Sequence, residues 1–353
     1  MEVLMRVTMK DIAERCGIGR STVSFILNGT AANVGLSEEL CRRVLQTAKE
    51  MGYRRNELAS SVRSGKSRVI AYVNGGRLAA TYTMRMIAGI NDSLNRNGYS
   101  LRMYIHNNEE PLDLLIDKIL SNMISGVIID RFIKASGELI QQLQSWDIKV
   151  AMMDSFDVLY PVIQVGSDDE AGAAAAADQL YRLGHRRIGV SYMDVGPKLR
   201  IRPEFFLKRL GELGLENGES IRLGLSRNAS WNPEDAAKVA DFCRRPDHAT
   251  AIFCEADPIA LRFIQYAYQA GFHVPDDISV IGYANLDYTE YSNPPLSTFA
   301  TSFEDIGEKT ADLLIESIKN NRQSTEKVKL PAIYLERMST KPYNGIKQQE
   351  TEE

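Results

Sequence analysis

The sequence predicts an α/β protein with a small all-α head at the N-terminus and a larger body of two lobes, each a parallel sheet flanked by helices. Residues 8–52 carry helical patterns with capping residues and no strand pattern. From residue 69 onward, short apolar runs alternate with helical segments, which is typical of parallel sheets. This alternation lasts for about 270 residues, more than one usual doubly wound domain, so we expect two lobes.

The head begins with two short helices around a tight turn. Thr8 has the side chain of an N-cap, and Asp11 three residues later completes a capping box. A helix over 9–16 then ends at Gly17, a natural left-handed stop, and a second helix covers 20–27. Ser37 caps a third helix with an apolar stripe at helical spacing that ends at Gly52.

The body divides into alternating strands and helices. We expect strands at 69–73, 99–105, 126–129, 149–153, 187–190, 251–254 and 279–283, and helices at 83–97, 112–123, 169–183, 204–213, 233–243, 257–270 and 303–320. The predicted boundaries are a head at 1–55, a hinge helix or linker at 56–67, a first lobe at 68–164 with 295–322, a second lobe at 165–294 with 323–342, and a flexible tail at 343–353. Ligands bind such sheets at the carboxyl ends of their strands.

Charge is distributed unevenly along the chain. The net charge of −4 combines +5 over residues 1–68, which hold 12 lysines and arginines against 7 acidic residues, with −9 over the remainder. A basic head on an acidic body favours a phosphate-bearing partner at one end. No long apolar stretch predicts a membrane span or a secretory signal, and the four cysteines lack metal-ligand spacing. We therefore expect a cytoplasmic protein without a metal or cofactor.

The second short helix has the composition of a DNA-contacting helix. Two short helices joined by a tight turn can place the second one in the major groove. Its outer face offers hydrogen-bonding groups from Arg20, Ser21, Thr22 and Ser24. Two roles fit Arg20: a bidentate contact to a guanine edge, or a phosphate contact.

Several segments together closely resemble the lactose-repressor (LacI/GalR) family of bacterial transcription regulators. In the head they are VTMKDIAERCG at 7–17, STVS at 21–24, LNG at 27–29, RVL at 43–45 and MGY at 51–53. In the body they are DDEAG at 168–172, LGHR at 183–186, VPDDISVIGY at 274–283 and PPLST at 294–298. The resemblance spans roughly residues 5–340.

The resemblance implies a helix-turn-helix head on a periplasmic-binding-protein-like body, a homodimer on a pseudo-palindromic double-stranded operator, and a small-molecule effector that changes operator affinity from the cleft between the lobes. Such a regulator works in the bacterial cytoplasm, on the nucleoid when bound. The implied DNA contacts are Thr8, Arg20, Ser21, Thr22, Ser24, Phe25, Asn28, Tyr53, Arg55, Asn56, Ala59, Val62 and Arg63.

Three of these positions depart from the family pattern. Val62 stands where the family inserts a leucine into the minor groove, so it is either a smaller wedge or a packing residue of the hinge. Arg55 replaces a linker proline. Phe25 replaces a polar or small residue, and either contacts thymine methyl groups or packs internally.

The implied effector contacts are Tyr82, Asp154, Arg202, Trp231 and Asp257. Structural alternatives stand beside four of them: a turn for Asp154, an ion pair for Arg202, a loop anchor for Trp231 and a helix cap for Asp257. Family hydrogen-bonding residues are replaced by Ala256 and Ala284, and a small glycine by Phe205. These changes disfavour an ordinary hexose. The ligands that stay compatible with these changes are a larger, modified or phosphorylated sugar or another metabolite, and the remaining alternative is a vestigial pocket that binds no effector.

Two other classes of function compete with a regulator. An enzyme is disfavoured because no nucleophile-elbow, zinc-protease, dinucleotide or P-loop motif occurs and the four histidines are scattered. A transport-type binding protein shares the two-lobed fold but needs a signal peptide, whereas this chain starts with a helix-turn-helix. The sequence does not show whether such a regulator represses or activates transcription. The family resemblance favours a repressor.

Overall fold

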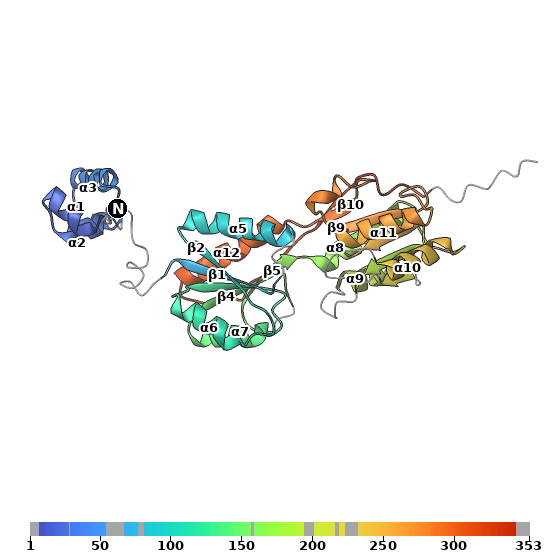
Figure 1. Cartoon of the computed structure of the whole chain (residues 1–353), viewed down its shortest axis with the longest axis horizontal. Coiled ribbons are helices and arrows are strands. Elements are labelled where there is room, and N and C mark those ends of the chain that lie inside the picture. Colours follow the sequence, from blue (N-terminus) through green and yellow to red (C-terminus); the bar gives the residue numbers. More distant parts are fainter. Residues whose placement is uncertain are drawn as a thin grey trace, which may run out of the picture. The chain divides into compact units, whose positions relative to one another are not determined.

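The computed structural model describes residues 7–27, 29–53, 67–76, 81–156, 159–193, 201–215, 219–222 and 232–343. The chain forms two compact units, residues 1–67 and residues 68–353 (Figure 1). The head lies in the first unit and both lobes lie in the second.

The head has the expected helices. They are α1 (Met9–Cys16), α2 (Arg20–Leu27), the 3₁₀ turn η1 (Ala31–Val34) and α3 (Glu38–Glu50). The predicted capping box is present, because the Thr8 hydroxyl accepts from the Asp11 N–H and the Asp11 carboxylate accepts from the Thr8 N–H at 2.7 Å. Gly17 has a φ of 67° and ends α1 in the left-handed region, and Ser37 caps α3.

A small apolar core holds the three head helices together. Ile12, Val23 and Val44, one from each helix, are fully buried, and Ala13, Ile26 and Ala48 complete the centre. Partly buried residues that include Tyr53 surround this centre. The head therefore has a core of its own, which fixes the orientation of α2 relative to α1.

The first lobe is built on a wholly parallel sheet with strand order β11-β5-β4-β3-β1-β2. The strands are β1 (Val69–Asn74), β2 (Ser100–Ile105), β3 (Gly126–Asp130), β4 (Lys149–Met153), β5 (Ile163–Ser167) and β11 (Lys327–Leu330). Helices α5 (Thr81–Asn97) and α12 (Phe303–Lys319) cover one face, and α6 (Leu112–Ser121) and α7 (Ser136–Ser145) cover the other (Figure 1).

The contact between α5 and α12 depends on two glycines. A Cβ on Gly89 would lie 1.9 Å from the carbonyl oxygen of Glu304, and a Cβ on Gly307 would lie 2.0 Å from that of Met86. The two backbones therefore approach closely, and Arg85 of α5 adds a bidentate ion pair with Glu304 at the same crossing.

The second lobe has the strand order β12-β10-β9-β8-β6-β7. Its strands are β6 (Ile188–Tyr192), β7 (Glu219–Arg222), β8 (Ala251–Cys254), β9 (Ser279–Ala284), β10 (Ser297–Ala300) and β12 (Ile333–Leu335). Helices α8 (Asp169–Arg182) and α9 (Ile201–Glu212) pack on one core of this lobe, and α10 (Pro233–Arg244) and α11 (Asp257–Gln269) pack on another. The 3₁₀ turn η3 (Asp287–Thr289) follows β9.

The strands divide between the lobes differently from the expected boundaries. β5 extends the first sheet to residue 167, β11 belongs to the first sheet and β10 belongs to the second. β12 is antiparallel to β10, and α7 was not among the expected helices. Edge strands such as β11 alternate exposed and half-buried residues, so they lack the continuous apolar run that identifies a buried parallel strand.

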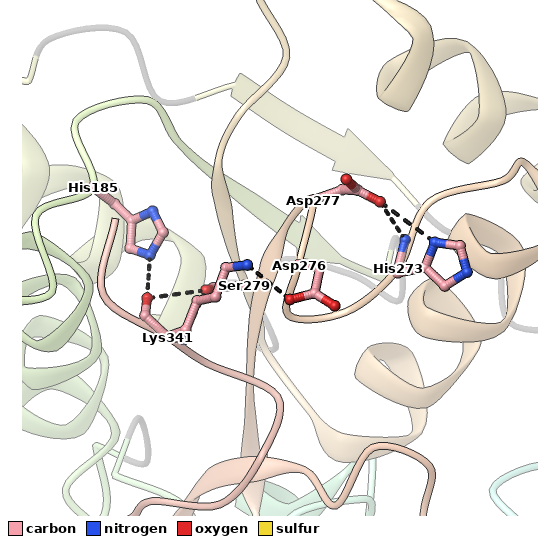
Figure 2. Close-up of polar contacts among 6 residues, drawn as sticks. All are labelled: His185, His273, Asp276, Asp277, Ser279 and Lys341. Atoms are coloured by element: carbon pink, nitrogen blue, oxygen red, sulfur yellow. Dashed lines mark hydrogen bonds and ion pairs between the residues drawn. The ribbon is translucent and has the colours of Figure 1, made fainter. Parts of the chain in front are cut away.

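A C-terminal strap, residues 339–343, is bound along the second lobe through His185 and Ser279. Figure 2 shows the His185 ring and the Ser279 hydroxyl both directed at the carbonyl oxygen of Lys341. The His185 Nε2 donates to that oxygen at 3.1 Å, and its Nδ1 lies 2.9 Å from the hydroxyl of Thr250. The Lys341 ammonium pairs with Asp276 at 2.8 Å. His185 is therefore a structural residue that holds the strap to the second lobe.

We expect this histidine to make folding sensitive to acid. Burial lowers the pKa of His185 to about 4 from an ordinary 6.5. Because the unfolded chain takes up the proton first, stability is fully present above pH 6.5 and is lost as the pH falls towards 4. Between pH 7.5 and pH 5 the loss amounts to about 2 kcal/mol.

Urea unfolding of the wild type and of His185→Gln at both pH values measures this effect. The free energy of unfolding of the wild type should fall by about 2 kcal/mol more than that of the variant, since the variant lacks the titrating ring. The subtraction also removes the contributions of other groups that titrate in this range. Equal pH dependence in the two proteins would show that His185 is protonated without cost.

Candidate functional site

Helix α2 exposes a polar face to solvent. Arg20 and Ser21 are exposed, and Thr22 and Ser24 are half-buried at the edge of the head core. The Phe25 side chain is 40% exposed, so part of its ring is open to a partner surface. These residues form a continuous outer surface on the second helix of the helix-turn-helix.

The other predicted DNA contacts divide into two groups. Thr8 caps α1, and Tyr53 is half-buried against the head core. The remaining ones lie outside the described residues: Asn28, Arg55, Asn56, Ala59, Val62 and Arg63.

In the body, a small pocket of about 60 Å³ lies at the carboxyl ends of the strands. Arg131 reaches it from the end of β3 in the first lobe, and the other lining residues come from the second lobe: Asp169, Met193, Ile201, Arg202, Glu255 and Ala256. Four of the seven side chains are charged. Such a polar pocket can recognise a small polar molecule through hydrogen bonds.

Arg202 is held on three sides. Its Nη1 donates to the backbone carbonyl of Glu255 at 2.8 Å, and its Nη2 pairs with Asp169 at 3.0 Å. Its guanidinium lies over the Tyr283 ring, 4.0 Å from the centroid. Burial lowers the pKa of Arg202, but the carboxylates of Asp169 and Asp154 outweigh burial and raise it above its ordinary value. Arg202, which the family resemblance predicts as an effector contact, thus lines the pocket. It also forms the ion pair that was the structural alternative to that role.

Asp154 contacts the pocket through a second arginine. Its Oδ2 accepts from Nη1 of Arg131 at 2.6 Å, and both side chains are largely buried. Asp154 has a φ of 57°, a left-handed conformation that directs the chain into the turn after β4. The structure therefore gives it both an ion pair and a turn.

Glu255 follows β8 and is 4% exposed. One carboxylate oxygen accepts from the Met193 N–H at 2.6 Å. Burial raises the pKa of Glu255 to about 7, although that hydrogen bond and the guanidinium groups of Arg202 and Arg131 oppose the rise. Its charge therefore changes near neutral pH.

Asp257 and Tyr82 do not line this pocket. Asp257 is fully buried in the first turn of α11, and both its oxygens are used: Oδ1 accepts from the Thr298 hydroxyl at 2.6 Å and Oδ2 from the Leu286 N–H at 2.8 Å. Tyr82 packs on Phe303 with 5.6 Å between ring centroids. Trp231 lies outside the described residues.

The three departures from the family pattern have different surroundings. Ala256 lines the pocket, so its missing polar group is a real change there. Ala284 is buried in the first-lobe core with a φ of 118°, and Phe205 is packed against the second-lobe core. Neither Ala284 nor Phe205 lines the pocket.

Sequence reasoning missed Arg131, Asp169 and Glu255. All three immediately follow or begin an element at the edge where parallel strands end, which is the signal that applied to Asp154. Asp169 stands next to Asp168, whose side chain caps α8 by accepting from the Ala171 N–H, and the sequence does not separate the roles of these two adjacent aspartates. In the parts of the chain that the structure describes, no cluster of histidine, cysteine and carboxylate side chains suits a metal ion.

Comparison with known proteins places these two units in one kind of protein. Residues 8–56 match the family model for bacterial regulatory proteins of the lacI family, and residues 177–340 match that of the periplasmic binding protein-like domain. The chain belongs to the LacI family of bacterial transcriptional regulators. Members of this family combine a DNA-binding helix-turn-helix with an effector-binding body, and both parts are present here.

Relatives of the whole chain agree with the LacI assignment. The HTH-type transcriptional regulator DegA of Bacillus subtilis is 27% identical over 346 residues, covering 96% of this chain and all of that protein. The ribose operon repressor of Escherichia coli K12 is 27% identical over 342 residues, covering 94% and 99%. The solved lac repressor dimer bound to operator and an anti-inducer has the same fold, with a TM-score of 0.77 and 21% identity over 95% of this chain and 99% of that one.

As a LacI-family member the chain is a DNA-binding transcriptional regulator with an effector-binding domain, and the prediction from its sequence segments is confirmed. Across the described parts of the chain, no helix is long and apolar enough to cross a membrane.

Proposed function

We propose that this protein is a repressor that binds a pseudo-palindromic operator as a homodimer and changes its operator affinity when a small molecule occupies the pocket of Arg131, Arg202 and Glu255. It acts in the bacterial cytoplasm, on the nucleoid. The observation that carries the proposal is the exposed polar face of α2 in a head that matches the lacI family model.

The DNA side of the proposal rests on charge and geometry. A two-helix motif with a capped first helix presents the start of α2, where Arg20 lies, to a groove edge. The head is basic and the body acidic, so phosphate attracts one end of the molecule. A dimer supplies two heads for two half-sites, as in the solved lac repressor dimer.

The effector side rests on the pocket. Its lining comes from both lobes, so a ligand there has different contacts when the lobes change their relative position. Sugars are the first class to consider, because one relative is a ribose operon repressor and a solved LacI-family regulator from Enterococcus faecium, 23% identical with a TM-score of 0.66, contains bound ribose.

The proposed domain organisation keeps the head, hinge and two lobes that the sequence predicts. It differs in three strands: β5 and β11 are assigned to the first lobe and β10 to the second.

Arg20→Ala tests the DNA side. The operator is first selected from a pool of random double-stranded DNA. If Arg20 pairs with a base edge, the variant should bind that operator with about 1–3 kcal/mol less affinity, a loss of roughly 5- to 150-fold. Fluorescence anisotropy at a stated salt concentration measures the dissociation constant.

Two comparisons interpret the result. Random DNA of the same length should lose little affinity, because base contacts contribute only to the specific complex. Arg182→Ala in α8 of the body is the matched control, since it removes an arginine far along the chain from the head. Equal losses of affinity on operator and random DNA would show that Arg20 contacts phosphate and not a base edge. Failure to select any DNA sequence from the pool would overturn the proposed function.

A further inference from the structure

The first lobe presents one firmly held arginine to the pocket. Asp130, at the end of β3, accepts the Phe132 N–H on Oδ1 at 2.8 Å, which closes a turn around Arg131. The Oδ2 of Asp130 accepts from the Asn74 side-chain amide at 2.7 Å and so ties this turn to the end of β1. Asp154 holds the guanidinium itself through Nη1 at 2.6 Å. Arg131 is therefore anchored in the first lobe, although every other described residue that lines the pocket belongs to the second.

The second lobe presents an ion pair of the same kind. Arg202 of α9 lies 3.0 Å from Asp169 at the start of α8, and its Nη1 donates to the Glu255 carbonyl oxygen at 2.8 Å. The side chains of both pairs, Arg131 with Asp154 and Arg202 with Asp169, are largely buried. Water and salt therefore screen these four charges much less than they screen a surface pair.

The two ion pairs act on each other between the lobes. Arg131, Arg202 and Asp169 line the same pocket, so the first-lobe pair and the second-lobe pair meet there. Burial lowers the pKa of Arg131, but the carboxylates of Asp154 and, from the second lobe, Asp169 outweigh burial and raise it. Burial likewise lowers the pKa of Arg202, and the carboxylates of Asp169 and, from the first lobe, Asp154 outweigh it. Each guanidinium is therefore stabilised by a carboxylate of the opposite lobe as well as by its own.

Hydrogen-bonding capacity is left over on both sides. In the described part of the chain, Arg131 donates a single side-chain hydrogen bond, the one to Asp154. Asp169 Oδ1 is buried and has no hydrogen-bond partner there, although Arg202 lies at ion-pair distance from it. A buried carboxylate oxygen without a donor is costly. An approach of Arg131 to Asp169 is therefore favourable, and this contact needs both lobes.

We propose that the ion pairs Arg131–Asp154 and Arg202–Asp169 form a clasp, in which each cation attracts the carboxylate of the opposite lobe and which holds the two lobes in the arrangement of this structure. Each pair is anchored within its own lobe, so a rotation of the lobes separates the two pairs without breaking either. The clasp thus favours one lobe arrangement over others. Resting on the proposed function, the clasp is also the element that an effector in the pocket biases to change operator affinity.

A double-mutant cycle between the lobes measures the clasp. Arg131→Gln, Asp169→Asn, the double variant and the wild type are unfolded with urea as full-length proteins, without DNA or added metabolites. We expect the two substitutions to be non-additive, because each removes one side of the same attraction. Arg131→Gln should change the unfolding equilibrium constant of the body at least about fivefold less in the Asp169→Asn background than in the wild type.

Asp178→Asn is the matched control for Asp169→Asn. Asp178 also lies on α8 and pairs with Arg209 of α9 at 2.8 Å, so the helices and the chemistry are the same, but this pair does not line the pocket. Arg131→Gln should have the same effect on unfolding with and without Asp178→Asn. This comparison separates the clasp from a general weakening of the contact between α8 and α9.

A replacement pair keeps the proposal testable if Asp169→Asn does not fold. Glu255→Gln then takes its place at pH 8, because Glu255 is a second-lobe carboxylate that lines the same pocket and interacts with Arg131. Additive effects of Arg131→Gln and the second-lobe substitution would overturn the clasp.

Operator affinity tests the link from the clasp to DNA. The operator selected with the wild type is titrated with Arg131→Gln and Asp178→Asn, again without metabolites. The dissociation constant should change at least about threefold for Arg131→Gln and stay within experimental error for Asp178→Asn, because only the first shifts the lobe arrangement. An unchanged operator affinity of Arg131→Gln would overturn this link. A wild type that selects no operator would overturn the proposed function, while the unfolding cycle would still decide whether the clasp exists.

Discussion

Replacing Val44 by asparagine is expected to abolish operator binding while leaving the body folded. Val44 is fully buried between the three helices of the head. Losing the burial of a valine costs about 1.5–3 kcal/mol, and an unsatisfied amide in its place adds about 1–3 kcal/mol. A domain of this size has little stability in reserve, so a loss of about 4 kcal/mol unfolds most heads and should lower operator affinity more than a hundredfold.

The neighbouring residue provides the control. Leu45 lies next to Val44 on α3 but is 51% exposed, so Leu45→Asn should change head stability by less than about 0.5 kcal/mol. Circular dichroism melts should show the body transition unchanged in both variants, because head and body are separate compact units. Wild-type operator binding by Val44→Asn would mean that DNA recognition does not depend on the helix-turn-helix core.

Asp257→Ala is expected to destabilise the body by about 3–5 kcal/mol, whatever ligand is present. The carboxylate connects α11 to β10 through the Thr298 hydroxyl and to the segment after β9 through the Leu286 N–H. Truncation leaves both donors buried without an acceptor, and each costs about 1–3 kcal/mol in addition to the lost hydrogen bonds to a charged group. Urea unfolding of the ligand-free protein measures the change.

Two further variants define what this result means. Asp257→Asn keeps one acceptor and should lose about half as much stability, whereas Asp241→Ala, at an exposed position of α10, should lose almost none. A stable Asp257→Ala protein that has lost its ligand response would return Asp257 to the effector-binding role that the family resemblance implies.

The contrast between Asp257 and Glu255 shows how far sequence reasoning reaches at a site. Both residues are acidic and lie close together: Glu255 directly follows β8, and Asp257 is the first residue of α11. The family resemblance singled out Asp257, but the structure encloses it, with both oxygens used internally. Glu255, two residues earlier, lines the pocket instead. Neighbouring residues after a strand point in different directions, and only the packed turn decides which of them faces a cavity.

The sequence by itself determined the local structure and the kind of protein. The capping box of Thr8 and Asp11, the left-handed stop at Gly17 and the cap at Ser37 delimit helices by interactions within a few residues, so they are readable without a fold. Buried strands such as β1, β3, β4, β8 and β9 are likewise visible as short apolar runs, whereas the buried strands β5 and β10 were not among the expected ones.

Only the tertiary structure decided which distant residues meet. The pairing of Arg131 with Asp154, the enclosure of Arg202 by Asp169 and Tyr283, and the assignment of β10 and β11 to their sheets all join segments that are far apart in the chain. The sheet that a late strand joins and the partner of a buried ion pair cannot be read from neighbouring residues, because the path of the chain through the fold sets both. The set of charged side chains that line the pocket is therefore a property of the folded body alone.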